Sequence, residues 1–134
     1  MKGVSSVSII SDTHGLIDSH IINYLKNTDV IIHAGDICST KIISDLNRYC
    51  DDVYMVAGNN DIPEKFSDQN DKAIISNLKK SQTIEINNQL ISVEHGDRFG
   101  HHADHNGLRQ SYPDSKLIIY GHTHIQACDQ EKDP

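Results

Sequence analysis

The chain has 134 residues, which is enough for one domain with a substantial core and too few for two ordinary ones. It carries 19 acidic and 12 basic side chains, giving a formal net charge of -7. No run of Lys or Arg is present to neutralise phosphates, which argues against a general DNA- or RNA-binding protein. We therefore expect one domain over residues 1–134 that does not bind nucleic acid.

The number and spacing of the cysteines and the length of the apolar runs indicate in which cellular compartment the protein is expected. Cys38, Cys50 and Cys128 are widely spaced and form no Cys-x-x-Cys pair, which disfavours both a disulfide framework and a thiolate zinc site. The apolar runs are too short for a membrane span, and no apolar segment of a secretory signal follows Lys2. We expect a soluble protein of the reducing cytoplasm without membrane association.

Three β-branched runs alternate with two helical patterns in the first half of the chain. The predicted strands are residues 7–10, 29–33 and 53–57. The first predicted helix starts at Asp18 or Ser19 and the second at Ser39 or Thr40, since these side chains can cap a first turn. The order βαβαβ implies a parallel sheet with right-handed crossovers, and so an α/β fold.

Residues 62–81 show no clear period. Pro63 and several charges favour a loop, while residues 73–80 fit either a helical turn or an irregular strand. We expect this segment to form a mobile flap beside the strand tips.

The second half of the chain opens with a hairpin pattern. Residues 83–86 and 90–93 alternate in period 2 around Asn87 and Asn88, which is typical of two antiparallel strands. A polar, histidine-rich loop follows the hairpin. The remaining predicted elements are a short helix, a strand and a tail, over residues 107–112, 117–120 and 125–134.

Each of five predicted strands ends in a polar cluster beside a glycine. The glycines are Gly15, Gly35, Gly58, Gly96 and Gly121. In an open α/β sheet a ligand site lies outside the carboxyl ends of the strands, so we expect the clusters to converge there. Together they supply Asp12, His14, Asp36, Asn59, His95, His122 and His124. This set of carboxylates, imidazoles and one amide has the composition of a two-metal site.

The last cluster, Gly121-His122-Thr123-His124, follows the apolar run of residues 117–120. If the extended backbone continues through the cluster, His122 and His124 project to the same side and Thr123 to the other. Two converging imidazoles suit a transition metal ion. Taken alone, the motif would more often describe two surface histidines after a core strand, and the other four clusters favour the metal.

The ordered motifs resemble those of the calcineurin-like metallophosphoesterase family, specifically its small prokaryotic phosphodiesterase branch. The family signature runs D-x-H, G-D, G-N-x-D, H-G and G-H-x-H, and the chain has these motifs in this order between Val7 and Ile125. The resemblance implies an α/β/β/α sandwich with two sheets between helices. It also implies an enzyme that hydrolyses phosphodiesters or phosphomonoesters.

Carried over residue by residue, the resemblance implies two metal sites. Asp12, His14 and His124 would hold one ion, Asn59, His95 and His122 the other, and Asp36 would bridge the two. Such ligands accept several divalent ions, with manganese expected first and iron, zinc, cobalt or nickel as alternatives. A water or hydroxide shared by both ions would attack a small phosphoester substrate, without a side-chain nucleophile.

Two positions beside the implied ligands are catalytic candidates. Relatives carry a protonatable His or Cys at the position of Asn60, whose amide can donate a hydrogen bond but no proton. Asp61 either caps the following segment or orients a ligand. Asn59, taken without the resemblance, would be a left-handed turn residue.

Other departures from the family pattern concern rate and substrate class more than metal binding. Many small relatives read His-Gly-His where this chain has His95-Gly96-Asp97. His101, His102 and His105 either replace the missing proton donor or belong to a solvated loop.

Two further residues lie close to the motifs in sequence. His33 is expected to pack beside the site or support a ligand without binding metal itself. Cys38 is expected to be a small buried thiol.

Relatives continue beyond the last motif with further strands, so the resemblance implies a C-terminally shortened sandwich. The open sheet edge would either pair with a second copy, giving a homo-oligomer, or leave residues 126–134 poorly ordered. The alternative function is a catalytically weak scaffold or interaction protein with the same fold, as in the retromer subunit. A scaffold would have eroded ligands, whereas all seven motif positions are intact.

Overall fold

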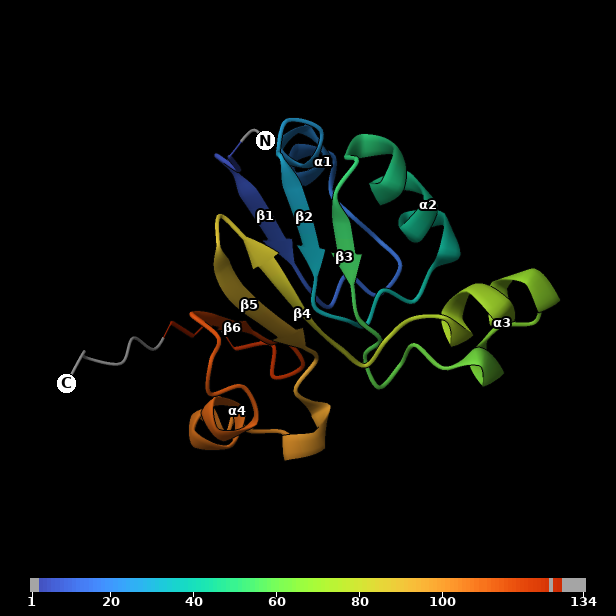
Figure 1. The fold of residues 1–134 in the computed structure, drawn as a ribbon. Coiled ribbons are helices and arrows are strands. Elements are labelled where there is room, and N and C mark those ends of the chain that lie inside the picture. Colours follow the sequence, from blue (N-terminus) through green and yellow to red (C-terminus); the bar gives the residue numbers. More distant parts are fainter. Residues whose placement is uncertain (1–2, 126, 129–134) are drawn as a thin grey trace.

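Two three-stranded sheets form the middle of the fold (Figure 1). The computed structural model describes residues 3–125 and 127–128. The first sheet is parallel, in the order β1 (Val7–Ile10), β2 (Val30–His33) and β3 (Val53–Met55). In the second sheet, β5 (Gln89–Glu94) pairs antiparallel with β4 (Ser81–Ile86) and parallel with β6 (Leu117–Ile119).

The helices begin where the sequence offers capping side chains. Asp18 accepts a hydrogen bond from the His20 amide at the first helix, and Ser39 accepts one from the Ile42 amide at the second. The α-helices are α1 (Ser19–Leu25), α2 (Thr40–Tyr49), α3 (Gln69–Ser76) and α4 (His105–Ser111). Two single 3₁₀ turns, η1 (Pro63–Lys65) and η2 (Asp97–Phe99), complete the helical elements of the described residues.

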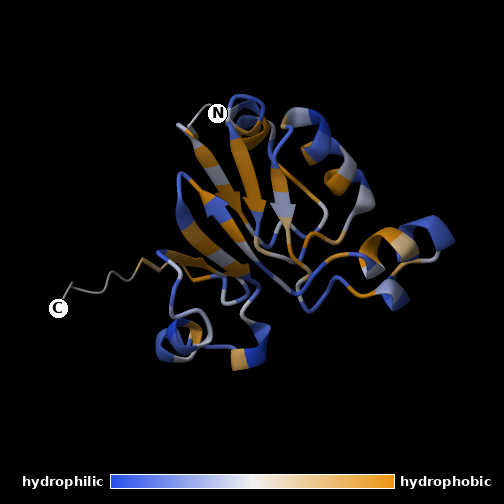
Figure 2. Cartoon of the chain, in the orientation of Figure 1, coloured by the Kyte–Doolittle hydropathy of each residue, from blue (hydrophilic) through white to orange (hydrophobic). Residues whose placement is uncertain are grey.

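Two apolar clusters hold the layers together. Ile31 of β2 faces a cluster to which α1, α2 and α3 contribute, whereas Val30 and Ile32 face a second cluster formed with β4, β5 and β6. Both faces of β2 are therefore buried, as expected for a central parallel strand, and Figure 2 shows apolar residues gathered on both sheets. With α4 beyond the second sheet in Figure 1, the predicted α/β/β/α sandwich is confirmed.

The prediction of a loop over residues 62–81 is wrong for most of the segment, whereas the helical alternative for residues 73–80 is confirmed for residues 73–76. It contains η1 and α3, and Ile75 of α3 is 2% exposed in the cluster under the first sheet. The helical period is hard to read because Ile75 is the one buried residue of α3. Asp68 caps the helix, but in the sequence a charged residue at this position is equally typical of a loop.

The predicted hairpin is confirmed, with Asn87 and Asn88 both in left-handed backbone (φ 51° and 64°) between β4 and β5. Across the described part of the chain, the helices are too short or too polar to cross a bilayer.

Apart from Ala127 and Cys128, the predicted poorly ordered tail lies outside the described residues. Within those residues, β1 and β6 are edge strands of their sheets. Pairing with a second copy stays a prediction.

Candidate metal centre

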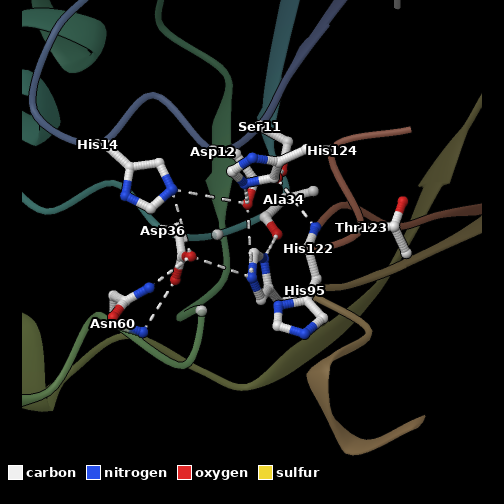
Figure 3. Close-up of polar contacts among 12 residues, drawn as sticks. Ser11, Asp12, His14, Ala34, Asp36, Asn60, His95, His122, Thr123 and His124 are labelled. Carbon is white, nitrogen blue, oxygen red and sulfur yellow. Dashed lines mark hydrogen bonds and ion pairs between the residues drawn. The ribbon is translucent and has the colours of Figure 1, made fainter. Parts of the chain in front are cut away.

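The loops that follow β1, β2, β5 and β6 meet at the carboxyl ends of the strands. They bring five of the predicted ligands into two overlapping groups, in each of which the ligand atoms lie within 4.8 Å of one another. The groups are Asp12, His14, His124 and Asp12, Asp36, His95. Figure 3 shows these side chains directed toward one another from separate loops. The predicted convergence of the strand-tip clusters is thus seen for these five residues.

The buried ring of His95 has a nitrogen with no hydrogen-bond partner. Its Nδ1 lies 2.8 Å from the carbonyl oxygen of Ala34, which only accepts, so Nδ1 carries the proton. The Nε2 of the neutral ring then presents a lone pair, and it has no partner among the described residues. It faces Asp36 Oδ2 at 3.3 Å and Asp12 Oδ1 at 3.6 Å. Three electron-pair donors around one point fit a cation between them.

The spacing of the donor atoms also fits a shared ion. Ligands about 2.0 to 2.2 Å from one metal ion lie roughly 3 to 3.5 Å apart. His124 Nε2 lies 3.2 Å from Asp12 Oδ1, and His14 Nε2 lies 3.6 Å from Asp36 Oδ2 and 4.0 Å from Asp12 Oδ1. These separations approach those of coordinated ligands, so small side-chain movements would complete a coordination shell.

Asp36 is held as a carboxylate by its neighbours. Burial acts most strongly and raises its pKa, but two hydrogen bonds from Asn60 and the nearby rings of His95 and His14 outweigh it, leaving the pKa below its ordinary value. The Asn60 backbone N–H donates to Oδ1 and its Nδ2 donates to Oδ2, each at 2.9 Å. Asp36 therefore stays charged while 2% exposed, a state that a bound cation would stabilise.

Hydrogen bonds to one carboxylate oxygen of Asp12 orient its side chain, and the other oxygen faces the histidines. Its Oδ2 accepts hydrogen bonds from the Ser11 hydroxyl and the His122 backbone N–H. Its Oδ1 is the atom that approaches His14, His95 and His124. One carboxylate thus links the first strand tip to the last cluster of the sequence.

Left-handed backbone is concentrated at the candidate ligands. Five of them have positive φ, namely Asp12 (54°), His14 (47°), Asp36 (55°), His122 (72°) and His124 (57°). This conformation is uncommon outside glycine and gathers at functional sites, where the surrounding fold must impose it. The hairpin asparagines, in contrast, occupy a turn that requires it.

Two buried side chains tie the loops together without facing the donor cluster. His33 Nδ1 accepts from the Gly35 N–H, so its Nε2 carries the proton and donates to the Thr13 hydroxyl at 3.0 Å. Burial lowers the pKa of His33 to about 4, although Asp61 and Asp12 act in the opposite direction. The prediction that His33 supports the site without binding metal agrees with this geometry.

Asp61 is 4% exposed and accepts three backbone hydrogen bonds. The Gly58 and Ile37 amides donate to Oδ2, and the Cys38 amide donates to Oδ1. Asp61 thereby joins the loop after β3 to the loop after β2. Both of its oxygens are occupied by amides, which is the geometry of a positioning residue.

Two glycines are required by close approach. A Cβ on Gly121 would collide with the side chains of Ser11 and Asp12, and one on Gly35 would collide with the His95 ring and Gly58. Gly35 also has φ of 104°, which favours glycine. The strand-tip glycines let the backbones come close enough for the ligands to meet.

Comparison with known proteins identifies this arrangement. The model of the calcineurin-like phosphoesterase superfamily domain matches residues 6–134. The chain belongs to this superfamily.

Alignments with individual similar proteins extend over nearly all of the chain. A probable metallophosphoesterase of Mycoplasma genitalium is 33% identical over 131 residues, which cover 90% of this chain and 66% of that protein. A phosphodiesterase of Methanocaldococcus jannaschii is 26% identical over 140 residues, covering 95% and 78%. The solved structure of vacuolar protein sorting 29 from Cryptosporidium parvum has a TM-score of 0.78 at 20% identity, covering 97% and 70%. The metallophosphoesterase fold is confirmed, and the chain spans about two thirds of the M. genitalium relative.

The two histidines of the last superfamily motif do not lie as an extended strand would place them. β6 ends at Ile119, and His122 and His124 both have left-handed backbone. The His124 ring lies against Asp12 and His14, whereas the His122 ring packs against His95 and stacks on His101. The condition of that prediction, an extended backbone through the motif, is not met, so the common side that it implied does not apply.

Asn59 and Asn60 are placed differently from one another. Asn59 lies exposed in the turn after β3, and the hydrogen bonds to Asp36 come from Asn60 instead. Asn59 as a metal ligand stays a proposal. Sequence patterns did not point to the Ser11 hydroxyl, which donates to Asp12, or to Lys65, which donates to Asn60. Pro63, which starts the turn leading to Lys65, is the available signal.

Proposed function

We propose that the chain is a metal-dependent phosphoesterase that hydrolyses phosphodiesters, with phosphomonoesters as a second substrate class. The observation that carries this proposal is the unpartnered Nε2 of His95, buried between the carboxylates of Asp12 and Asp36. One buried and one partly buried negative charge beside a lone pair are costly unless a cation lies among them. Membership of the phosphoesterase superfamily supports the same reading.

The proposed ligand sets follow the two sides of the cluster. Asp12, His14 and His124 would hold one divalent ion, and Asn59, His95 and His122 the other. Asp36 would bridge them, because its Oδ2 lies between His14 and His95, which belong to different sets. Manganese is our first choice, since carboxylate oxygens and imidazoles together suit it, with iron, zinc, cobalt and nickel as alternatives.

The bound ions would supply an acidified water as nucleophile and neutralise charge on the phosphoryl oxygens. The residues of the chain hold the site in shape around them. Asn60 fixes both oxygens of Asp36 and, as an amide, supplies no proton to a leaving group. Asp61 holds the loops after β2 and β3 together by accepting hydrogen bonds from three backbone amides.

The net charge near the centre also favours a phosphate ester. Asp12 and Asp36 together contribute two negative charges, which two divalent ions would exceed by two positive charges. A locally positive site can attract an anionic substrate although the whole chain has a net charge of -7. We further propose a cytoplasmic location, supported by the free thiols of Cys38, Cys50 and Cys128.

The test is a panel of chromogenic mono- and diesters, including bis(4-nitrophenyl) phosphate, offered to protein stripped with a chelator and reloaded with Mn²⁺. We expect turnover of the diester that requires metal and is absent in the Asp36→Asn variant. Metal-loaded protein that turns over no ester would overturn the proposal and favour the scaffold alternative.

A further inference from the structure

A lysine lies two hydrogen bonds away from the carboxylate proposed to bridge the metals. Lys65 Nζ donates to Asn60 Oδ1 at 2.5 Å, and Asn60 Nδ2 donates to Asp36 Oδ2 at 2.9 Å. The orientation of the amide follows from chemistry, because a carboxylate only accepts and an ammonium only donates. Asn60 therefore links a positive charge at the rim of the site to its centre.

The backbone places Lys65 at this rim through contacts at both ends of a short segment. Asp61 anchors the start of the segment to the loop after β2, and the Pro63 turn η1 then reverses the chain. Phe66, directly after the turn, packs against the core cluster under the first sheet. The Lys65 side chain itself is exposed, so it can meet a ligand that arrives from solvent.

The α3 helix holds the same segment from its other side. The Thr40 hydroxyl of α2 donates to the Asp71 carboxylate of α3 at 2.8 Å, and Ile75 is buried in the core. The position of Lys65 is thus part of the packed fold.

We propose that Lys65 binds the ester oxygen that leaves the phosphorus when the substrate is cleaved. This inference rests on the proposed function. In an in-line displacement the leaving oxygen lies opposite the attacking water. The water belongs with the ions at the centre, so the leaving oxygen points outward, toward the rim where Lys65 lies. Asn60 holds the ammonium there until the substrate accepts it.

The chemistry that Lys65 assists is balanced by water alone. A bond forms from the water oxygen to phosphorus, and the bond from phosphorus to the ester oxygen breaks with its electron pair remaining on that oxygen. The water loses a proton to solvent and the leaving oxygen takes one up from solvent. The ammonium lowers the energy of the negative charge that grows on the leaving oxygen, which Asn60 can do only as a neutral donor.

The test compares Lys65→Met with the matched control Lys116→Met on Mn²⁺-loaded protein. Lys116 is exposed directly before β6, at the opposite end of that strand from the site, and its loss changes the net charge equally. The substrates are diesters whose leaving groups run from 4-nitrophenolate through phenolate to an alkoxide. A donor to the developing charge in an enclosed site is worth about 100- to 1000-fold, and we expect about 10- to 100-fold for the exposed Lys65 at the more basic leaving groups.

We expect Lys65→Met to lose about 10- to 100-fold in kcat/KM on the alkyl ester and less than about threefold on the nitrophenyl ester. Lys65→Arg should restore most of the loss, and Lys116→Met should match the wild type at every leaving group. Manganese content should be the same in all variants. An equal loss at all leaving groups, or no loss, would overturn the inference while leaving the proposed function standing.

A second readout does not need turnover. Calorimetric binding of inorganic phosphate to the Mn²⁺-loaded protein should weaken about threefold to tenfold in Lys65→Met and not in Lys116→Met. Wild-type protein that binds phosphate through Lys65 but cleaves no ester would contradict the proposed function and, with it, a leaving-group role. Unchanged phosphate affinity together with unchanged kinetics would contradict the Lys65 assignment alone.

Discussion

The site is built from two halves that the fold holds in different ways. The carboxylate half consists of the loops after β1, β2 and β3, residues 11–15, 34–38 and 58–61, and the imidazole half consists of the loops after β5 and β6, residues 95–102 and 121–125. In the first half the Asp36 side chain is 3% exposed and that of His14 is 42% exposed, and in the second half the His95 side chain is buried while that of His124 is 60% exposed. Amide donors satisfy the carboxylates of Asp36 and Asp61, whereas the exposed His124 ring is held by Asp12.

The proposed metal ligands of the two halves are held in place by different contacts. Like charges such as those of Asp12 and Asp36 repel, so a fold that brings them together must fix them with backbone and amide donors. The imidazoles of the other half are directed by Asp12, through the His122 N–H and the His124 ring. His95 joins the halves, because its ring is buried and bonded to Ala34 of the carboxylate half. We infer that the two carboxylates and His95 are preorganised and that metal orders the rest of the imidazole half.

The largest effect is expected from Asp36→Asn in the carboxylate half. The amide removes the proposed bridge and leaves His95 facing one carboxylate, so both ions should be lost and hydrolysis should fall by more than about a thousandfold. Elemental analysis and diester kinetics on the same preparation measure both. Retention of two tightly bound ions per chain would show that Asp36 is not the bridge.

A smaller effect is expected from His124→Ala in the imidazole half. Because His124 contacts Asp12 and His14 and belongs to one proposed set, the variant should chiefly empty one site and lose about 100-fold in hydrolysis. Manganese titration followed by calorimetry should show one strong site in place of two. Loss of both ions would mean that the two halves are not separable.

His33→Gln tests the carboxylate half through pH. His33 has a pKa of about 4 when folded and an ordinary pKa near 6.5 when unfolded. Between these values His33 is protonated in the unfolded chain and neutral in the folded one, so the free energy of unfolding decreases as pH falls from 6.5 toward 4. Above pH 6.5 His33 is neutral in both states and has no effect on the pH dependence of stability. For metal-free protein, the drop in the free energy of unfolding between pH 7 and pH 4.5 should be about 2 to 3 kcal/mol smaller in His33→Gln. Urea unfolding measures it, and equal drops in both proteins would contradict the buried neutral state of His33.

The smallest effect is expected from His101→Ala. Its ring stacks on His122 at 5.9 Å, in an exposed loop of the imidazole half. Because the metal is proposed to order that half, loss of the stack should change manganese affinity by less than about threefold. A tenfold or larger change in the calorimetric affinity would show that loop packing preorganises the imidazole half as well.

Much of the carboxylate half could be predicted from the sequence because regular patterns determine it. The β-branched runs, the capping residues Asp18 and Ser39 and the strand-tip glycines all have physical signatures in the chain, and the parallel sheet follows from their order. The convergence of Asp12, Asp36 and His95 follows from that sheet.

The remainder depends on backbone conformation and on contacts between distant residues. The left-handed backbone of His122 and His124 is imposed by surrounding contacts, so strand periodicity does not extend through the motif. α3 has a single buried residue, Ile75, which leaves almost no helical pattern to read. The contact of Lys65 with Asn60 arises only after the Pro63 turn folds back.

The central claim is that these loops hold two divalent ions between the carboxylates and the imidazoles. Anomalous difference maps from crystals of the Mn²⁺-loaded protein test it most directly. We predict two peaks about 3.5 to 4 Å apart, with Asp36 between them and His95 Nε2 coordinated to one. A map with no peak between Asp12, Asp36 and His95, from protein that is folded and loaded with manganese, would contradict the account.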